Sequence, residues 1–385
     1  MFYLNQPKKQ RDKYVKYLKL IGSISRIYSQ SPIPYLYYRA AENIFCLSFE
    51  ADDLSRSDVS VDAKKKNIGI GLKTFLHSNG KTLQKIAEFN TMSPKIHNSV
   101  TIEEKVQTIA ELRNERIRIT KELYGLKDMF YHCVTRDIGV NNIYEFSMDL
   151  IDANNLSIDT VSEKSILFND GINEYSFNFS KSTLLKRFVC NDLIDTVEID
   201  IYKNPLDFLM KNSEEFTEKS ELIIPKEILK SQSNNVIFLP LYAPSSKQFE
   251  PAEKSGLNQW NASGRDRHSD EVYIPIPAWI HKKFPNFFPP SNDYSFDLML
   301  PNGKMLSAST CQAGRKGLMS NPNKDLGKWL LRDVLNIPED VLVSRQHLNE
   351  AGIDSAKLTK IDDGVYEIDF MPVGSYERFK NTYRE

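Results

Sequence analysis

The sequence predicts an α+β or α/β protein of two domains, the first with a mixed sheet and helices, the second a small β-barrel. The chain has 385 residues, more than one compact hydrophobic core usually holds. Long helical patterns dominate its first third, whereas short strand patterns dominate its last third. A zone rich in Ser, Glu and Lys at about 213–234 separates them. We therefore expect domains at 1–232 and 233–385.

Composition and charge restrict the class of protein. Hydrophobic residues make up 41% and charged residues 26%, which is ordinary for a globular protein. A net charge of −1 argues against a wholly basic DNA binder but allows a basic groove on one face. The sequence has no apolar run long enough to span a membrane, and its first residues are charged where a signal peptide is apolar. Four scattered cysteines without a CxxC pair predict neither a zinc site nor disulfides, and they favour a cytoplasmic location.

The first domain begins with helices and continues with strands. "TIEE" supplies a capping box for its longest helix, through Thr101 and Glu104. After residue 129, short runs such as "IYEFSMDLI" and "DTVEIDIY" predict strands up to about 202. We expect helices at 8–30, 35–47, 81–89 and from 101 to about 125, and a strand at 68–75.

The second domain is predicted to consist mainly of strands. "VIFLPLY", "EVYIPIP", "FDLML", "KMLSAST" and "VYEIDF" alternate in the manner of short strands. Two helices are expected between them, near 325–335 and 344–351. This is the pattern of a small barrel with flanking helices.

The stretch "DAKKKNIGIGLKTF" resembles part of a nuclease active site. Asp62 precedes an apolar strand, and Lys73 stands at the end of that strand. Metal-dependent nucleases of the PD-(D/E)XK kind carry a second acid two residues before that lysine, where this chain has Gly71. The stretch is therefore an inactive site, a coincidence, or a site that takes its second acid from elsewhere.

Two glutamates are candidates for the missing carboxylate. In some relatives of this nuclease class the acid migrates to the following helix, and Glu88, on the helix expected at 81–89, lies at a similar spacing. Glu42 stands in an otherwise apolar helix, where a lone acid is costly to bury without a partner or metal. By this resemblance, Asp62, Lys73, Glu88 and Glu42 are the expected catalytic residues, and Asp62, Glu88 and Glu42 the expected Mg²⁺ ligands. Glu50 and Asp58 are further candidates, and ordinary solvated surface charges are the alternative.

Two polar loops in the second domain have side chains suited to reading DNA. Asn and Gln pair with adenine edges and Arg with guanine, and the start of the helix near 325 suits a phosphate. That helix is expected to present Lys328 outward and to bury Trp329, Leu330 and Val334. The alternative is that both loops are merely solvated. The candidates are Asn258, Gln259, Trp260, Asn261, Arg265 and Arg267 in the first loop, and Gln312, Arg315, Lys316, Ser320, Asn321, Lys324 and Lys328 in and after the second.

Residues from about 235 to 385 resemble the B3-like DNA-binding domain of type II restriction endonucleases, in the form found in BfiI and NgoFVII type enzymes. The segments that carry the resemblance are "KSGLNQWNASGR", "EVYIPIPAWIHKKFPNFFP", "LMLPNGKMLSASTCQAGRKGLMSNPNKDLGKWLLRDVL" and "VYEIDF". The resemblance implies an open seven-stranded barrel. It also implies that the loops at 258–267 and 311–324 are two arms that clamp the major groove.

The catalytic half departs from BfiI type enzymes, which use an HxK motif followed by Asp and no metal. The only HxK here, from His281 to Lys283, lies inside the B3-like domain, and Phe288 stands where the Asp belongs. A covalent histidine mechanism is therefore not expected.

Together these patterns predict a Mg²⁺-dependent type II restriction endonuclease that cuts double-stranded DNA at a short sequence. Cutting two strands implies a homodimer or a transient pairing on DNA, and the resemblance implies a cognate DNA methyltransferase. One alternative is an inactive, sequence-specific DNA-binding subunit or regulator. A weaker one is a modification-dependent endonuclease.

Overall fold

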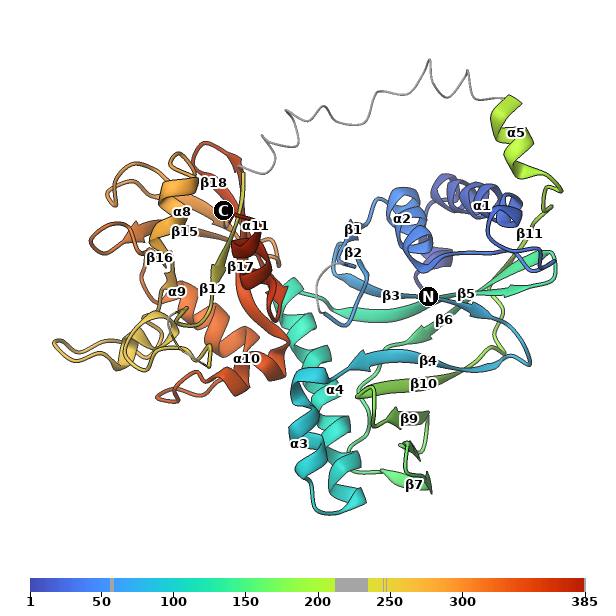
Figure 1. The fold of residues 1–385 in the computed structure, drawn as a ribbon, viewed down its shortest axis with the longest axis horizontal. Helices are drawn as coiled ribbons and strands as arrows, with labels where there is room; N and C mark the ends of the chain where they lie inside the picture. Colours follow the sequence, from blue (N-terminus) through green and yellow to red (C-terminus); the bar gives the residue numbers. More distant parts are fainter. Residues whose placement is uncertain (56–58, 212–234, 245, 247, 384–385) are drawn as a thin grey trace. The chain divides into compact units, whose positions relative to one another are not determined.

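The computed structural model describes residues 1–55, 59–211, 235–244, 246 and 248–383 (Figure 1). The predicted boundary zone at 213–234 lies outside these residues. The chain divides into two compact units, which are described separately. The first unit comprises Met1–Ile117 and Leu126–Glu221, and the second comprises Arg118–Gly125 and Leu222–Glu385.

The described part of the first unit contains two sheets and their covering helices, of which α4 continues into the second unit from Arg118 on. A six-stranded sheet has the order β1-β2-β3-β5-β6-β11, and a five-stranded sheet has the order β4-β10-β9-β8-β7. The elements are η1 (Tyr3–Asn5), α1 (Lys8–Ser23), η2 (Ser25–Ile27), α2 (Tyr38–Phe49), β1 (Asp52–Asp53), β2 (Ala63–Lys65), β3 (Ile68–Leu76), β4 (Lys81–Glu88), η3 (Asn90–Met92), α3 (Ser93–Asn98), α4 (Ile102–Tyr124), β5 (Asp128–Asp137), β6 (Val140–Ser147), β7 (Ser157–Val161), β8 (Ser165–Asn169), β9 (Glu174–Asn178), β10 (Thr183–Val189), β11 (Asp195–Glu198) and α5 (Pro205–Lys211).

Helices α1 and α2 cover one face of the six-stranded sheet. Ile70 and Leu72, alternate residues of β3, share a buried core with Tyr14 of α1 and Phe45 of α2. Side chains alternate between the faces of a strand, so Gly71 and Lys73 belong to the opposite face. Strand β3 is antiparallel to β2 and parallel to β5, which makes the sheet mixed, as predicted.

The helix predicted at 81–89 is wrong, because these residues form β4. The strand pairs with β10 in antiparallel register, from Lys81 opposite Val189 to Glu88 opposite Thr183. A nine-residue helix is marginal by itself, whereas β10 pairs with this segment along its whole length, with one register shift between Leu184 and Leu185. The long-range partner decides the structure of this segment.

The predicted capping box of α4 is confirmed. The backbone N–H of Glu104 donates to Oγ1 of Thr101 at 3.2 Å, and the Thr101 N–H donates to the Glu104 carboxylate at 3.2 Å. The helix ends at Tyr124, and Gly125 follows with a φ of +62°. A positive φ at this position is typical of helix ends and favours glycine.

The second unit is a nearly closed, barrel-like sheet of seven strands, in the order β12-β17-β18-β14-β15-β16-β13. The predicted barrel is therefore confirmed, although neither β17 nor β16, which lies inside the loop expected at 311–324, was predicted from the sequence. The elements are β12 (Val236–Pro240), η4 (Gly256–Asn261), β13 (Ile274–Pro275), α8 (Ala278–Lys283), β14 (Phe296–Met299), β15 (Met305–Cys311), β16 (Gly317–Ser320), α9 (Asp325–Gly327), the π-helix η5 (Lys328–Val334), α10 (Arg345–Ala351), β17 (Ile353–Asp362), β18 (Val365–Pro372) and α11 (Ser375–Thr382). Within the described part of the chain, no helix is both long and apolar enough to cross a membrane.

Candidate nuclease site and DNA-reading loops

Asp62 and Lys73 lie together at the β2–β3 hairpin. The Asp62 N–H donates to the Ile70 carbonyl at 2.8 Å, and its Oδ2 accepts the Leu72 N–H at 2.6 Å. These bonds fix the carboxylate against the backbone of β3. The Nζ of Lys73 lies 4.0 Å from the same oxygen, and both side chains remain partly exposed.

Glu42 of α2 adds a second carboxylate to this pair. Its side chain is buried, and its Oε2 accepts a hydrogen bond from Nη1 of Arg39 at 2.8 Å. Burial raises the pKa of Glu42, and the negative charge of Asp62 raises this pKa further, against the lowering effect of Arg39. The charge of Asp62 therefore disfavours the ionised form of Glu42. The sequence drew attention to Glu42 because it is an acid in an apolar helix. In the structure this acid is paired with Arg39 and is influenced by the charge of Asp62.

Glu88 belongs to a different group of side chains. It lies at the end of β4 in the five-stranded sheet, where Lys85 holds its carboxylate at 3.0 Å and the Asn90 amide donates to it. Lys85 also lowers the pKa of Glu88. The structure therefore pairs Asp62 with Lys73 and Glu42 with Arg39, and it leaves Glu88 with Lys85, because the segment expected to be a helix is strand β4.

The position of the missing acid is filled by other side chains. A Cβ on Gly71 would lie 2.8 Å from Cε of Met148 and 3.1 Å from Cδ1 of Tyr131. A side chain at position 71 would therefore have to displace the Met148 methyl group and would crowd the Tyr131 ring. Across the described residues, no group of three or more His, Cys, Asp and Glu side chains is arranged to hold a metal ion. Glu50, which caps α2, is exposed, and Asp58 lies outside the described residues.

Arg39 is a site residue that the sequence analysis did not identify. It stands in the first turn of α2, three residues before Glu42. Side chains at this spacing are neighbours on a helix surface. The sequence signal for the Arg39–Glu42 pair is an arginine three residues before the acid of an apolar helix.

The side chain of Asn258, in the first loop of the second unit, forms hydrogen bonds inside the protein. Its side chain is buried, donates to the Val343 carbonyl at 3.0 Å and accepts the Val343 N–H at 2.8 Å. Asn258 thus fixes the loop to the segment before α10. Asn261, which is exposed, donates to the Glu253 carbonyl at 3.0 Å. Among the described residues, the buried Gln259 Oε1 and Trp260 Nε1 have no hydrogen-bond partner.

The two arginines of the first loop are held by acceptors close to them in the sequence. Arg265 pairs with Glu271 through both carboxylate oxygens, at 2.5 and 3.3 Å, while its own side chain is 55% exposed. Arg267 donates to the Ala262 carbonyl at 2.6 Å. The pair with Glu271 therefore holds a solvent-facing guanidinium in a defined position.

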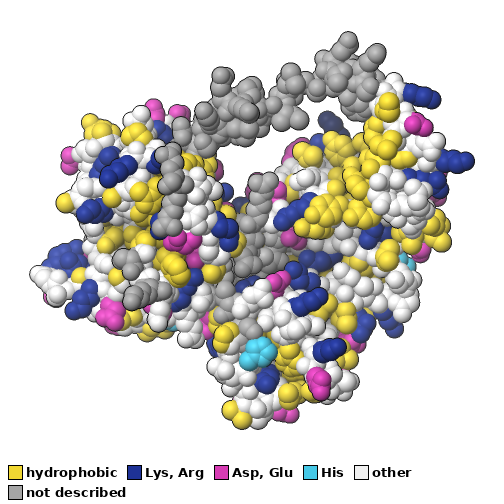
Figure 2. Space-filling view, viewed as in Figure 1, with side chains coloured by type: hydrophobic (Ala, Val, Ile, Leu, Met, Phe, Trp, Pro, Cys, Tyr) yellow, Lys and Arg dark blue, Asp and Glu magenta, His cyan; other side chains and the backbone are white. Residues whose placement is uncertain are grey.

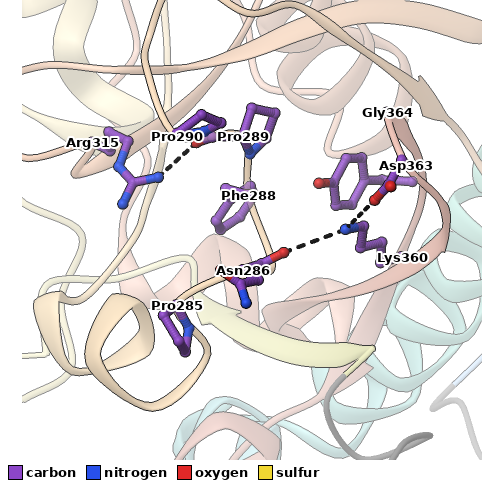
Figure 3. A pocket seen from close by; sticks show the side chains of 10 residues that line it. Pro285, Asn286, Phe288, Pro289, Pro290, Arg315, Lys360, Asp363 and Gly364 are labelled. Atoms are coloured by element: carbon purple, nitrogen blue, oxygen red, sulfur yellow. Dashed lines mark hydrogen bonds and ion pairs between the residues drawn. The ribbon is translucent and has the colours of Figure 1, made fainter.

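The second loop contains both exposed and structural side chains. Gln312 and Lys316 are exposed, whereas Arg315 donates to the Pro289 carbonyl at 2.6 Å. Figure 3 shows Arg315 beside a pocket of about 500 Å³, which Phe288 and Lys360 also line.

Ser320, at the end of β16, is nearly buried. Its hydroxyl accepts the Leu326 N–H at 2.8 Å and donates to the Pro322 carbonyl at 2.8 Å. Ser320 therefore shapes the start of α9 from inside the protein.

The helix after the second loop has the expected faces. Lys328 is exposed, while Trp329, Leu330 and Val334 are buried, so this prediction is confirmed. Asn321 and Lys324 are exposed as well. Figure 2 shows Lys and Arg side chains at several places on the surface of the second unit.

Most of the second unit is similar to a known DNA-binding domain. Residues 230–362 match the family model of the NgoFVII C-terminal B3-like DNA-binding domain. The match includes both polar loops and the strands from β12 to β17. None of the curated proteins matches the chain significantly.

Proposed function

We propose, from the premise that residues 230–362 are a B3-like DNA-binding domain of the restriction-enzyme kind, that this protein is a type II restriction endonuclease. The second unit reads a short sequence of duplex DNA, and the first unit hydrolyses the phosphodiester bonds. The observation that carries the catalytic part is the ion pair of Lys73 with Asp62 beside strand β3, with the buried Glu42 of α2 within the electrostatic influence of Asp62.

The donor set fits Mg²⁺. This ion keeps several waters and is usually bound by one or two carboxylates together with substrate phosphates. Asp62 and Glu42 supply two carboxylates, and a DNA phosphate would complete the set. When bound, the metal would polarise the phosphate and lower the pKa of the attacking water.

Lys73 has two tasks in this proposal. Its ammonium stabilises negative charge that develops on the phosphate, and it orients the water for attack. Its partial exposure and its 4.0 Å distance from Asp62 leave it able to contact a substrate. The arrangement resembles the PD-(D/E)XK nucleases, except that Glu42 takes the part of the acid that Gly71 cannot supply.

A second candidate function is a DNA-binding subunit or regulator without nuclease activity. The observation in its favour is the packing of Met148 and Tyr131 into the place of the usual acid. This candidate predicts sequence-specific binding with no metal-dependent cutting.

The deciding experiment is digestion of mixed-sequence DNA with Mg²⁺ by the wild type, Lys73→Ala and Lys85→Ala. Lys85 is a matched control, because it is also ion-paired to an acid on a strand, but in the five-stranded sheet. We expect discrete fragments from the wild type and Lys85→Ala, and none from Lys73→Ala. Binding in a gel without cutting by any of the three would support the regulator instead.

Partners follow from the same proposal. Each chain carries one cluster of Lys73, Asp62 and Glu42, so two strands require a homodimer or a transient pair of DNA-bound chains. A cognate DNA methyltransferase would protect the host DNA. Digestion of methylated and unmethylated copies of the target would separate an ordinary restriction enzyme from a modification-dependent one.

A further inference from the structure

Arg39 lies at the border between the buried Glu42 carboxylate and the solvent. Its Nη1 donates to Glu42 at 2.8 Å and to the Ser55 carbonyl at 3.0 Å, and its guanidinium lies 5.2 Å from the centre of the Tyr38 ring. The Arg39 side chain is 44% exposed, whereas that of Glu42 is 8% exposed. The Arg39 side chain therefore faces solvent, whereas the Glu42 side chain is largely shielded behind it.

Arg39 is hydrogen-bonded to Glu42, the carboxylate that the proposed metal site needs as a ligand. A buried carboxylate requires an opposite charge, and the neighbouring Asp62 increases this requirement. Arg39 meets it in the free protein. A divalent cation bound to Glu42 would meet it equally, but then the guanidinium and the metal would repel each other at one oxygen.

A DNA phosphate is the natural second partner of this guanidinium. Arginine presents a planar fork of donors that matches phosphate oxygens, and substrate bound at Asp62 and Lys73 brings phosphates to this edge of α2. Tyr38, 50% exposed, offers a ring against which the guanidinium stays ordered in either position.

We propose that Arg39 exchanges partners: it pairs with Glu42 in the free protein and with a DNA phosphate when a divalent metal binds Glu42 and Asp62. This inference rests on the proposed nuclease function. Arg39 thereby couples metal binding to DNA binding. Coupling of this kind is reciprocal, so each ligand favours the binding of the other.

The first test is titration of Mn²⁺ into the free protein by calorimetry at pH 8. We expect Arg39→Ala to bind Mn²⁺ about two- to fivefold more tightly than the wild type, the range for loss of a partly exposed ion pair. The matched control is Arg187→Ala, because Arg187 pairs with Glu174 at 2.5 Å in the five-stranded sheet and is also partly exposed. Its Mn²⁺ affinity should equal that of the wild type.

The second test repeats the titration with the target duplex, in a Lys73→Ala background that prevents cleavage. With DNA present, Arg39→Ala should lose its advantage in Mn²⁺ affinity, and its DNA affinity should fall. Arg39→Lys should retain part of the DNA affinity, because it keeps the charge but not the fork.

The outcomes separate this inference from the proposed function. Equal or weaker Mn²⁺ binding by free Arg39→Ala would overturn the partner exchange, even if Asp62→Asn and Glu42→Gln abolish binding. If Asp62→Asn and Glu42→Gln bind Mn²⁺ as the wild type does, the metal site itself is wrong. An advantage of Arg39→Ala that persists unchanged with DNA would show that Arg39 does not move to a phosphate.

Discussion

The ammonium of Lys73, on β3, lies 4.0 Å from the carboxylate of Asp62, the residue immediately before β2. The Asp62 side chain also accepts the Leu72 N–H, and its backbone donates to Ile70. The acid is thus fixed to the strand that carries the lysine. Its position does not depend on the ion pair, so Lys73 is free to respond to a substrate.

Asp62→Asn is expected to remove cleavage while DNA binding persists. The amide keeps the shape of the side chain but loses the charge that a metal requires, so we expect a loss in rate of at least about 100-fold. The measurement is digestion of target DNA beside a gel shift with the same fragment. Asp52→Asn is the control, since Asp52 is 69% exposed and only loosely paired with Lys64 at 3.7 Å. Unchanged cutting by Asp62→Asn would mean that the active site lies elsewhere.

Glu42→Gln and Glu88→Gln should behave differently. The charge of Asp62 acts on Glu42, whereas Glu88 is held by Lys85 and Asn90 in the other sheet. We expect cleavage to fall steeply in Glu42→Gln and to stay within about twofold of wild type in Glu88→Gln, as is usual for exposed ion pairs. Initial rates at saturating Mg²⁺ measure both. The reverse ranking would restore Glu88 as the migrated acid.

Gly71→Glu should lower stability and should not increase activity. Its Cβ would meet Met148 and Tyr131 at 2.8 and 3.1 Å, and overpacking of this kind costs about 1–3 kcal/mol. Thermal unfolding of the wild type, Gly71→Ala and Gly71→Glu measures the effect, which should already be present in the alanine variant. A stable and more active Gly71→Glu would show that the acid was simply lost from this position.

Local signals were sufficient for some elements and not for others. The apolar alternation of β3 and the Thr101–Glu104 box of α4 are complete within their own segments, so the sequence predicted both. Strand β4 depends on β10, about a hundred residues further on in the chain, and no short window contains that partner.

The candidate site shows the same division. Asp62, Lys73 and Glu42 could be predicted from residue type and local context. The crowding around position 71 comes from Met148 and Tyr131, which belong to distant segments. In the same way, the Asn258 side chain is of a type that can recognise a DNA base, but it is hydrogen-bonded to the backbone of Val343.

Asn258→Ala is expected to weaken the fold of the second unit before it alters sequence preference. The change leaves the Val343 N–H and carbonyl without their partner in a buried place, which costs about 1–3 kcal/mol. Thermal unfolding and DNA binding of Asn258→Ala and Asn261→Ala measure this, with Asn261 as the exposed neighbour. Full stability with an altered target sequence in Asn258→Ala would instead identify a direct reader.

Metal binding should be lost on acidification at a pH above the usual range of a glutamate. Burial, reinforced by Asp62, raises the pKa of Glu42 from its ordinary value of 4.5. As the pH falls, Glu42 therefore takes up its proton before an ordinary glutamate does, and the protonated acid cannot bind Mn²⁺.

The effect of pH on folding stability has the opposite direction. The raised pKa of Glu42 stabilises the folded state at low pH, and this contribution is lost as the pH rises through the pKa of Glu42 in the folded protein. Mn²⁺ titrations between pH 4 and pH 8, on the wild type and Glu42→Gln, test the first statement. The wild-type affinity should fall towards the weak, nearly pH-independent affinity of Glu42→Gln, and identical pH profiles of the two proteins would exclude Glu42 as a ligand.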